Sequence, residues 1–170
     1  MKTIYLLIGP RGSGKTYVGK LIQDKLNITF LNVETFFIRA EKINKKLDEE
    51  KFKKVWLKIE KRIDKILTTK KSVAFESIGI FQSFKDFLAR LNTKYQVKLV
   101  RIKTPLKLCD ERMATRKPGT HAHMTKADIA LVNKMSLREK YKYDLVIDNN
   151  KSSDVVIVSK FETFFLNSKK

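Results

Sequence analysis

The sequence contains little cysteine, proline or glycine, and it has no long apolar run. Cys109 is the single cysteine among 170 residues, which excludes an intramolecular disulfide framework and a zinc site built from several cysteines. With 3 prolines, 6 glycines and no linker-like or repetitive tract, we predict one domain over residues 1–170. No apolar run approaches the roughly 18 residues of a membrane helix. We therefore expect no membrane association, and a reducing cytoplasm is the simplest compartment.

Acidic residues are also scarce relative to basic ones. Asp and Glu number 18 against 37 Lys and Arg, which gives a formal net charge of +19. Such an excess is typical of nucleic-acid-binding proteins. The charge is spread along the chain, however, and 29 of the basic residues are lysine, whereas arginine is favoured for reading phosphates and bases. A solvated lysine-rich surface and a nucleic-acid-binding surface both remain open, and either would attract anionic substrates.

The apolar pattern predicts strands that alternate with helices. Short apolar runs predict strands over 3–8, 28–33, 72–75, 97–102 and 144–148. Helical periodicity covers 16–26, 47–67, 81–91 and 104–116. We expect Thr104 to cap the last of these with Pro105 at its first position, and Thr125 to cap a further helix through Asp128. Residues 154–166 fit a strand or a helix, and we favour a helix on the sheet. The pattern predicts an α/β fold with a five-stranded parallel sheet covered by helices on both faces.

A glycine-rich segment follows the first predicted strand. Residues 9–16, GPRGSGKT, match the phosphate-binding pattern G-x-x-x-x-G-K-[ST] between a strand and a helix. Gly12 and Gly14 can adopt positive φ, so that successive backbone N–H groups turn toward one phosphate at a helix N-terminus. Lys15 can reach the β- and γ-phosphates, and the Thr16 hydroxyl can coordinate Mg²⁺. The segment predicts binding of ATP and Mg²⁺ through Gly9, Pro10, Arg11, Gly12, Ser13, Gly14, Lys15, Thr16 and Tyr17.

With this motif, the sequence resembles the small P-loop kinases, namely the adenylate, shikimate and gluconate kinase-like group, and single-domain relatives often labelled AAA-family ATPases. The resemblance implies a three-layer P-loop NTPase fold with a lid at about 112–126. The segment Phe30-Leu-Asn32-Val-Glu34 is similar to the F-x-D-x-D pattern of shikimate kinases, with Asn32 and Glu34 at the two acidic places. Glu34 is a candidate general base or acceptor ligand. A carboxylate at a helix N-terminus without a catalytic role is the alternative.

A second carboxylate, Glu76, directly follows the third predicted strand. A carboxylate in that place can bind Mg²⁺ or activate an incoming hydroxyl, so Glu76 is a candidate metal ligand and catalytic residue. Shikimate kinases carry a run of glycines after this strand, and this chain does not. The difference argues against shikimate as the acceptor.

The segment 110–118 resembles the R-x-x-x-R lid entrance of the same kinases. Arg112 and Arg116 are four residues apart, so we expect them to share one helix face and converge on one anion. The resemblance implies that they stabilise the transferred phosphoryl group, or that Arg112 stacks on adenine. Surface arginines paired with neighbouring acids are the alternative. Asn149 and Asn150 follow the fifth strand, where relatives contact adenine.

Other polar and aromatic side chains carry weaker signals. His121 and His123 fall in the lid loop, where they lack partners for a zinc site and could meet the acceptor. Arg39 follows the second strand and could bind an acidic substrate. Cys109 and Trp56 lie on apolar helix faces and are predicted to pack in the interior.

Three functions are compatible with these features. The favoured one is an ATP- and Mg-dependent kinase that moves the γ-phosphate to a small-molecule or nucleotide-like acceptor. A polynucleotide 5′-kinase, or another nucleic-acid-processing P-loop enzyme, is motivated by the net charge of +19. A non-catalytic nucleotide-binding protein is the third.

Overall fold

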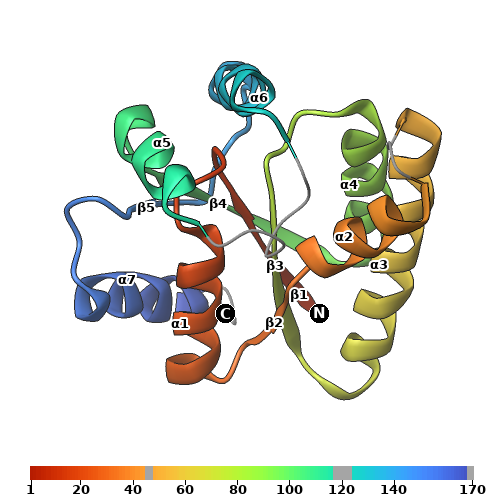
Figure 1. Cartoon of the computed structure of the whole chain (residues 1–170). Helices are drawn as coiled ribbons and strands as arrows, with labels where there is room; N and C mark the ends of the chain where they lie inside the picture. Colours follow the sequence, from red (N-terminus) through yellow and green to blue (C-terminus); the bar gives the residue numbers. More distant parts are fainter. Residues whose placement is uncertain (45–47, 117–123, 168–170) are drawn as a thin grey trace.

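A single parallel sheet forms the centre of the computed structural model, which describes residues 1–44, 48–116 and 124–167. Its strands are β1 Thr3–Ile8, β2 Thr29–Leu31, β3 Ser72–Ser77, β4 Gln96–Lys103 and β5 Leu145–Asp148. They lie side by side in the order β2-β3-β1-β4-β5 (Figure 1). The helices are α1 Lys15–Leu26, α2 Glu34–Asn44, α3 Glu49–Thr69, α4 Gln82–Lys94, α5 Leu106–Ala114, α6 Lys126–Arg138 and α7 Asp154–Asn167. The predicted five-stranded parallel α/β fold is confirmed.

Alternating side chains of β1 enter two separate cores. Ile4, Leu6 and Ile8 pack on α3 and α4, whereas Tyr5 and Leu7 pack on α1 and α7. These two helical layers flank the sheet in Figure 1. The C-terminal segment is the helix α7, as favoured from the sequence, because Phe161 packs edge-on against the Tyr5 ring at 5.2 Å between centroids.

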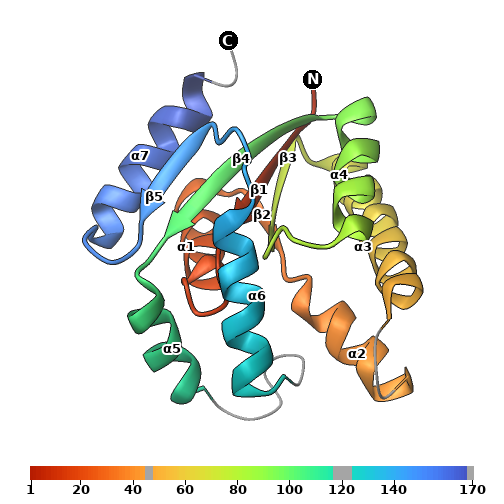
Figure 2. The same cartoon turned by 90° about the horizontal axis from the view of Figure 1, so that it is seen from above.

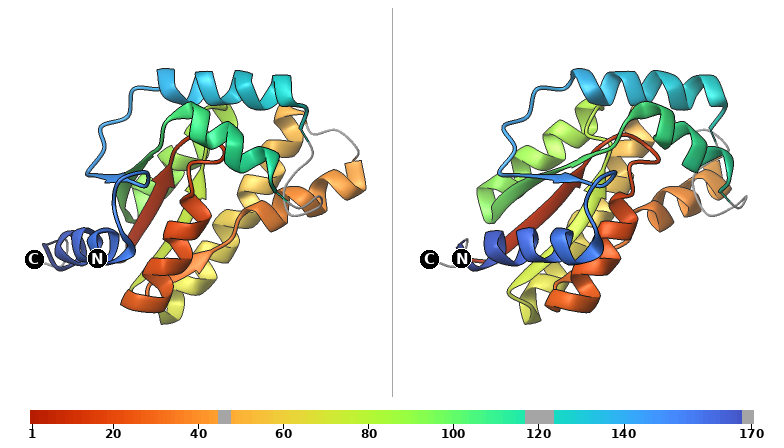
Figure 3. Two further views of the ribbon diagram at one scale, coloured as in Figure 1. Left: turned by 60° about the vertical axis from the view of Figure 1, so that its left-hand side comes forward. Right: turned by 90° about the vertical axis from the view of Figure 1, so that its left-hand side faces the viewer.

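The carboxyl ends of all five strands meet at one edge of the sheet. The loop before α1 and the start of α2 lie at this edge, and α5 and α6 lie there as well (Figures 1 and 3). Figure 2 looks onto the edge from above. Ligands of open parallel sheets bind beyond the carboxyl ends of the strands, so this edge is where the predicted site residues are to be sought.

Two details of the predicted element ends are wrong. The helix α5 begins at Leu106 after Pro105, and the Thr104 hydroxyl donates to the Ser13 carbonyl at 3.0 Å instead of capping it. The strand β2 stops at Leu31 because Asn32 Oδ1 accepts the Glu34 N–H at 3.2 Å and starts α2. The predicted cap of α6 by Thr125 is confirmed, with a reciprocal bond to Asp128. The predicted lid falls partly on 117–123, outside the described residues. Over the described ranges, no helix has the length and apolar character to span a bilayer.

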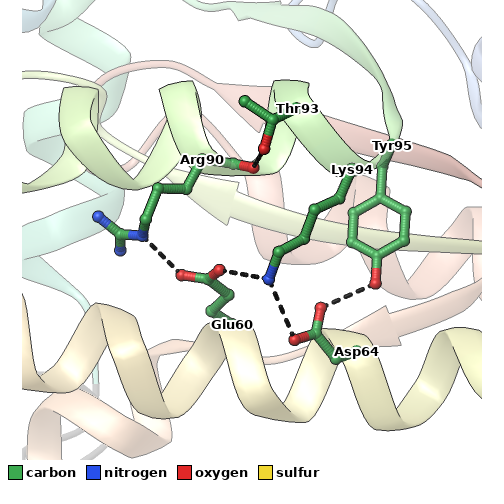
Figure 4. A network of polar contacts seen from close by, with 6 residues as sticks. All are labelled: Glu60, Asp64, Arg90, Thr93, Lys94 and Tyr95. Atoms are coloured by element: carbon green, nitrogen blue, oxygen red, sulfur yellow. Dashed lines mark hydrogen bonds and ion pairs between the residues drawn. The ribbon is translucent and has the colours of Figure 1, made fainter.

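Charged side chains join α3 to α4 (Figure 4). The buried Glu60 carboxylate accepts hydrogen bonds from Arg90 Nε at 2.9 Å and Lys94 Nζ at 2.8 Å. Asp64, one turn later, accepts one from the Tyr95 hydroxyl at 2.8 Å. Burial alone would raise the pKa of Glu60, but the bonds from Lys94 and Arg90 hold the pKa below its ordinary value. The network therefore fixes how α3 lies against α4.

We expect Glu60→Gln to lower the free energy of unfolding by about 1.5 kcal/mol near neutral pH, because it removes a buried charge that two cations contact. The lowered pKa means that the carboxylate stabilises the fold above the ordinary Glu pKa, and that this contribution disappears as the pH falls through the folded-state pKa. Urea unfolding at several pH values measures both effects. The control is Glu50→Gln on the same helix, whose exposed pair with Lys54 should contribute nothing measurable. Equal losses in the two variants would contradict the expectation.

Candidate functional site

Residues 9–14 form a tight loop between β1 and α1, and Lys15 and Thr16 begin the helix. Gly12 and Gly14 have φ values of 85° and 88°. A Cβ atom on Gly12 would collide with the Cys109 backbone, and one on Gly14 would collide with the Asn149 amide. Both positions therefore require glycine for two independent reasons. Because α1 begins at Lys15, the N–H groups of its first turn have no carbonyl partner within the helix and are available to an anion.

The Lys15 side chain curls back over this loop. Its ammonium donates to the carbonyls of Gly9 and Pro10, each at 2.9 Å, and the side chain is buried. Burial lowers the pKa of Lys15 from 10.5 to about 8, against the opposing effect of the Glu76 carboxylate. The ammonium is thus held inside the loop.

The Thr16 hydroxyl and the Glu76 carboxylate lie next to each other beside the loop, and both are hard oxygen donors. The Thr16 hydroxyl donates to Glu76 Oε1 at 2.7 Å. Glu76 is buried at the end of β3, opposite Leu7 of β1, which places it next to the loop. Among the residues that the structure describes, no group of three or more His, Cys, Asp or Glu side chains could hold a metal. Mg²⁺ needs no such group, because it takes one or two protein oxygens and completes its shell with water and phosphate oxygens. The two side chains fit that requirement.

Arg11 connects the loop to α2. Its Nη2 atom lies 3.0 Å from Glu34 Oε1, and its Nη1 atom lies 3.2 Å from the Met124 sulfur. The Arg11 side chain is only 12% exposed, whereas that of Glu34 is 29% exposed. Glu34 therefore keeps part of its surface accessible while the ion pair fixes its position.

One cavity of about 720 Å³ collects most of the predicted catalytic residues. Its wall includes Arg11, Lys15, Thr16, Glu34, Glu76 and Arg116. These residues come from five different segments of the chain, and only the sheet order brings them together. The predicted Arg112 is absent from the described wall.

Arg112 and Arg116 do not share a helix face, so that expectation is wrong. The helix α5 ends at Ala114, where the Thr115 hydroxyl donates to the Arg112 carbonyl at 3.2 Å. Arg116 follows the helix end and lines the cavity. Arg112 instead donates from Nη2 to the Asn149 carbonyl at 3.2 Å, and its buried Nη1 atom has no partner among the described residues.

Asn149 follows β5 and contacts the loop, and it is absent from the described cavity wall. Its amide nitrogen donates to the Ser13 carbonyl at 2.8 Å. Asn150 does not reach the loop through its backbone N–H, which donates to Asp148 at 3.1 Å. The Tyr17 side chain is half exposed, and its hydroxyl donates to Asp154 of α7. The Tyr17 group that could bind an anion at the loop is therefore its backbone N–H, not its side chain.

Asn133 of α6 is a site residue that the sequence analysis missed. It is buried, its Oδ1 accepts the Arg11 N–H at 2.7 Å, and its Nδ2 donates to the Arg11 carbonyl at 3.2 Å. Three residues further on, the Ser136 hydroxyl donates to the Ile78 carbonyl at 2.8 Å. A signal existed: Asn133 and Ser136 are polar and share the buried face of α6 with Val132, and buried polar groups need partners. The sequence pattern does not show that the partners are the backbone of Arg11 and the carbonyl of Ile78.

The remaining candidates do not form the phosphate-binding loop. Arg39 lines a separate hollow of about 450 Å³ with three lysines of α3, and it is absent from the main cavity. Cys109 is buried, as expected, and burial raises the pKa of its thiol. Trp56 packs in the core as predicted, but it also lines the main cavity. His121 and His123 lie outside the described residues.

Comparisons with known proteins agree with this architecture. A model of the "ATPase family associated with various cellular activities (AAA)" matches residues 5–102, more than half of the chain. No curated protein matches it significantly. A sugar kinase from Janibacter sp. HTCC2649 is similar with a TM-score of 0.70 at 17% identity, over 97% of this chain and 95% of that one. A gluconokinase from Sinorhizobium meliloti 1021 gives 0.67 at 17%, over 98% and 93%.

A third similar structure is the APS kinase of Mycobacterium tuberculosis in complex with AMPPNP and APS. It gives a TM-score of 0.61 at 17% identity, over 99% of this chain and 98% of that one. At such identities the likeness shows the fold alone. The predicted fold of the small P-loop kinases is thereby confirmed.

We expect Asn133→Ala to weaken ATP binding, because the Arg11 peptide loses two hydrogen bonds in a buried place, at a cost of about 2 kcal/mol. Calorimetric titration with ATP and Mg²⁺ measures the change in Kd. Ser136→Ala is the matched control, since it removes a buried bond of the same helix that does not reach the loop. Equal ATP affinities in the two variants would show that the contact with Arg11 does not support the loop.

Proposed function

This chain belongs to the ATPase family associated with various cellular activities (AAA), and from that premise we propose that it is an ATP- and Mg-dependent phosphotransferase with a small-molecule or nucleotide-like acceptor. The observation that carries the proposal is the single cavity that joins Lys15, Thr16 and Glu76 to Glu34 and Arg116. A protein that only binds nucleotide has no need of a second compartment with its own carboxylate. The kinase fold of the similar structures supports the same conclusion.

We assign ATP binding to the phosphate-binding loop. The N–H groups at the start of α1 and the Lys15 ammonium would hold the β- and γ-phosphates, because each offers positive charge to the same place. Thr16 and Glu76 would hold Mg²⁺, which when bound neutralises part of the triphosphate charge. Arg112 and Asn149 lie beside Gly14 outside the cavity wall, and we assign them to the adenine side.

The transfer step uses the cavity side of the loop. The acceptor oxygen forms a bond to the γ-phosphorus while the bond from that phosphorus to the β,γ-bridging oxygen breaks, and the electron pair of that bond leaves on ADP. When the acceptor is a hydroxyl, its proton passes to a carboxylate. Glu76 already accepts the Thr16 hydroxyl, so we assign the proton to Glu34, which Arg11 holds in place. Arg116 stabilises the charge that develops on the transferred group.

Lys15→Ala should reduce acceptor-dependent ADP formation by ~100-fold or more, because it removes a cation from the transition state. The measurement is ADP release over a panel of nucleosides, nucleotides and hydroxy acids. Lys25→Ala, an exposed lysine at the end of the same helix, is the control and should retain the parent rate. If no acceptor accelerates ADP release and Lys15→Ala behaves like the parent, the proposal is wrong.

Glu76→Gln and Glu34→Gln should separate the two carboxylates. Loss of a metal ligand at Glu76 should raise the Mg²⁺ concentration that gives half-maximal rate. Loss of the proton acceptor at Glu34 should lower kcat for a hydroxyl acceptor by ~100-fold and leave the Mg²⁺ dependence unchanged. Steady-state rates over a Mg²⁺ titration test both. An altered Mg²⁺ requirement in Glu34→Gln alone would reverse the assignment.

A further inference from the structure

The main cavity has two chemically different parts. All of its cationic wall residues in the described chain come from the phosphate-binding loop, from α1 or from the segment after α5. The part formed by α2, α3 and the segment 77–84 contributes no lysine or arginine to the described wall, and its side chains are mostly aromatic and aliphatic. The aromatic ones are Phe37, Phe52, Trp56, Phe81 and Phe84.

The aromatic part presents flat surfaces. Phe52 and Phe81 stack with their ring centroids 5.0 Å apart and their planes at 19°. Phe37 meets Trp56 edge-on at 5.1 Å and 74°. Phe37, Phe52 and Phe81 are only half-buried, so each keeps ring surface available in the cavity wall. Such walls bind a planar ring by offset stacking and edge-to-face contact.

Trp56 lines this wall, and its buried indole N–H has no hydrogen-bond partner among the described residues. The residue is 4% exposed. Its ring stacks on Phe87 at 4.8 Å between centroids, which holds the indole in place. A buried N–H without a partner costs about 1–3 kcal/mol, and a ligand atom that accepts a hydrogen bond would remove that cost.

The charges of the wall argue against an acidic group in the aromatic part of the cavity. Glu34 and Glu41 both line the cavity from α2, one turn of helix on either side of Phe37. Arg11 already pairs with Glu34 at 3.0 Å, and α2 and α3 add no cation to the described wall. A carboxylate placed among the aromatic rings would therefore lack a cation beside it, whereas a phosphate near Lys15 and Arg116 would not. The hydroxyls of a sugar acid would face phenylalanine rings, which cannot replace their hydrogen bonds to water. A neutral flat ring with carbonyl or ring-nitrogen acceptors avoids both costs.

We propose that the phosphoryl acceptor carries a planar heteroaromatic ring of the nucleobase kind, which lies against Phe37, Phe52 and Phe81 and accepts a hydrogen bond from Trp56 Nε1. Its other end, a sugar hydroxyl or a phosphate, lies toward Glu34 and Lys15. The inference rests on the proposed function, and it sets this chain apart from the gluconokinase that shares its fold. Nucleosides and nucleoside monophosphates share the ring, so the test includes both.

Binding of the ring can be measured without any transfer. Trp56 is the only tryptophan of the chain, so its fluorescence, excited beyond the absorption of the bases, reports on this wall alone. Nucleosides or nucleoside monophosphates, added without ATP, should quench it in a saturable manner, and gluconate and shikimate should not. Lys15→Ala should keep this quenching and lose transfer, which separates the ring site from the transfer chemistry. Quenching by the sugar acids, or by none of the probes, would overturn the inference.

Trp56→Phe tests the donor itself. It keeps an aromatic ring and removes the N–H, so the KM for the ring-bearing acceptor should rise about tenfold while kcat and the KM for ATP stay unchanged. Tyr143→Phe removes a polar atom from an aromatic side chain packed on the same core outside the cavity wall, and it should change neither constant. Thermal unfolding of both variants verifies that they fold.

The outcomes distinguish the two levels of the proposal. If gluconate or shikimate accelerates ADP release and the ring compounds do not, the protein is a kinase and the acceptor inference is wrong. If no compound accelerates ADP release, the proposed function fails, and the fluorescence titration still decides whether the ring site exists. An unchanged KM in Trp56→Phe would remove Trp56 from acceptor recognition.

Discussion

The structure depends on how the backbone of the phosphate-binding loop is held. Glycines at positive φ give the loop a shape that it cannot keep by local hydrogen bonds alone. Lys15 donates to its first carbonyls from inside, and Thr104 and Asn149 both donate to the Ser13 carbonyl. Asn133 holds the Arg11 peptide from α6. A loop fixed in this way presents its N–H groups to an anion without further ordering, which is the condition for electrostatic stabilisation of a transferred phosphate.

The same contacts make the loop the meeting point of the molecule. The side chains that hold the loop come from the end of β4, from α6 and from the turn after β5. The position of each of these segments therefore affects the shape of the loop. The α6 helix also reaches the turn after β3 through Ser136. The helix α6 therefore contacts both the phosphate-binding loop and the segment after β3. These two parts of the site are held in a fixed position relative to each other.

The part of the cavity formed by α2, α3 and residues 77–84, which we propose holds the acceptor, differs from the loop in its chemistry. The polar network of Glu60 with Arg90 and Lys94 lies on α3 and α4 (Figure 4), and α3 also carries Phe52 and Trp56 into the cavity wall. Ion pairs thus join α3 to α4, while aromatic side chains of α3 line the cavity. Under the proposed function, this compartment lies beside the loop that holds the triphosphate, and it selects the acceptor by shape, by one indole N–H and by two carboxylates.

The sequence by itself determined the loop, the alternation of strands and helices and the capped start of α6, because each depends on residues that are close together along the chain. Only the tertiary structure shows that Arg116 lines the cavity and Arg112 does not. The same is true of the hydrogen bonds between Asn133 and the Arg11 backbone. Asn133 and Arg11 are 122 positions apart. Contacts between residues so far apart depend on the order of the strands and on where each helix ends. Local sequence spacing determines neither of these. Of the aromatic wall, Phe52, Trp56 and Phe84 were visible as helical periodicity, yet only the folded chain shows that they line a cavity.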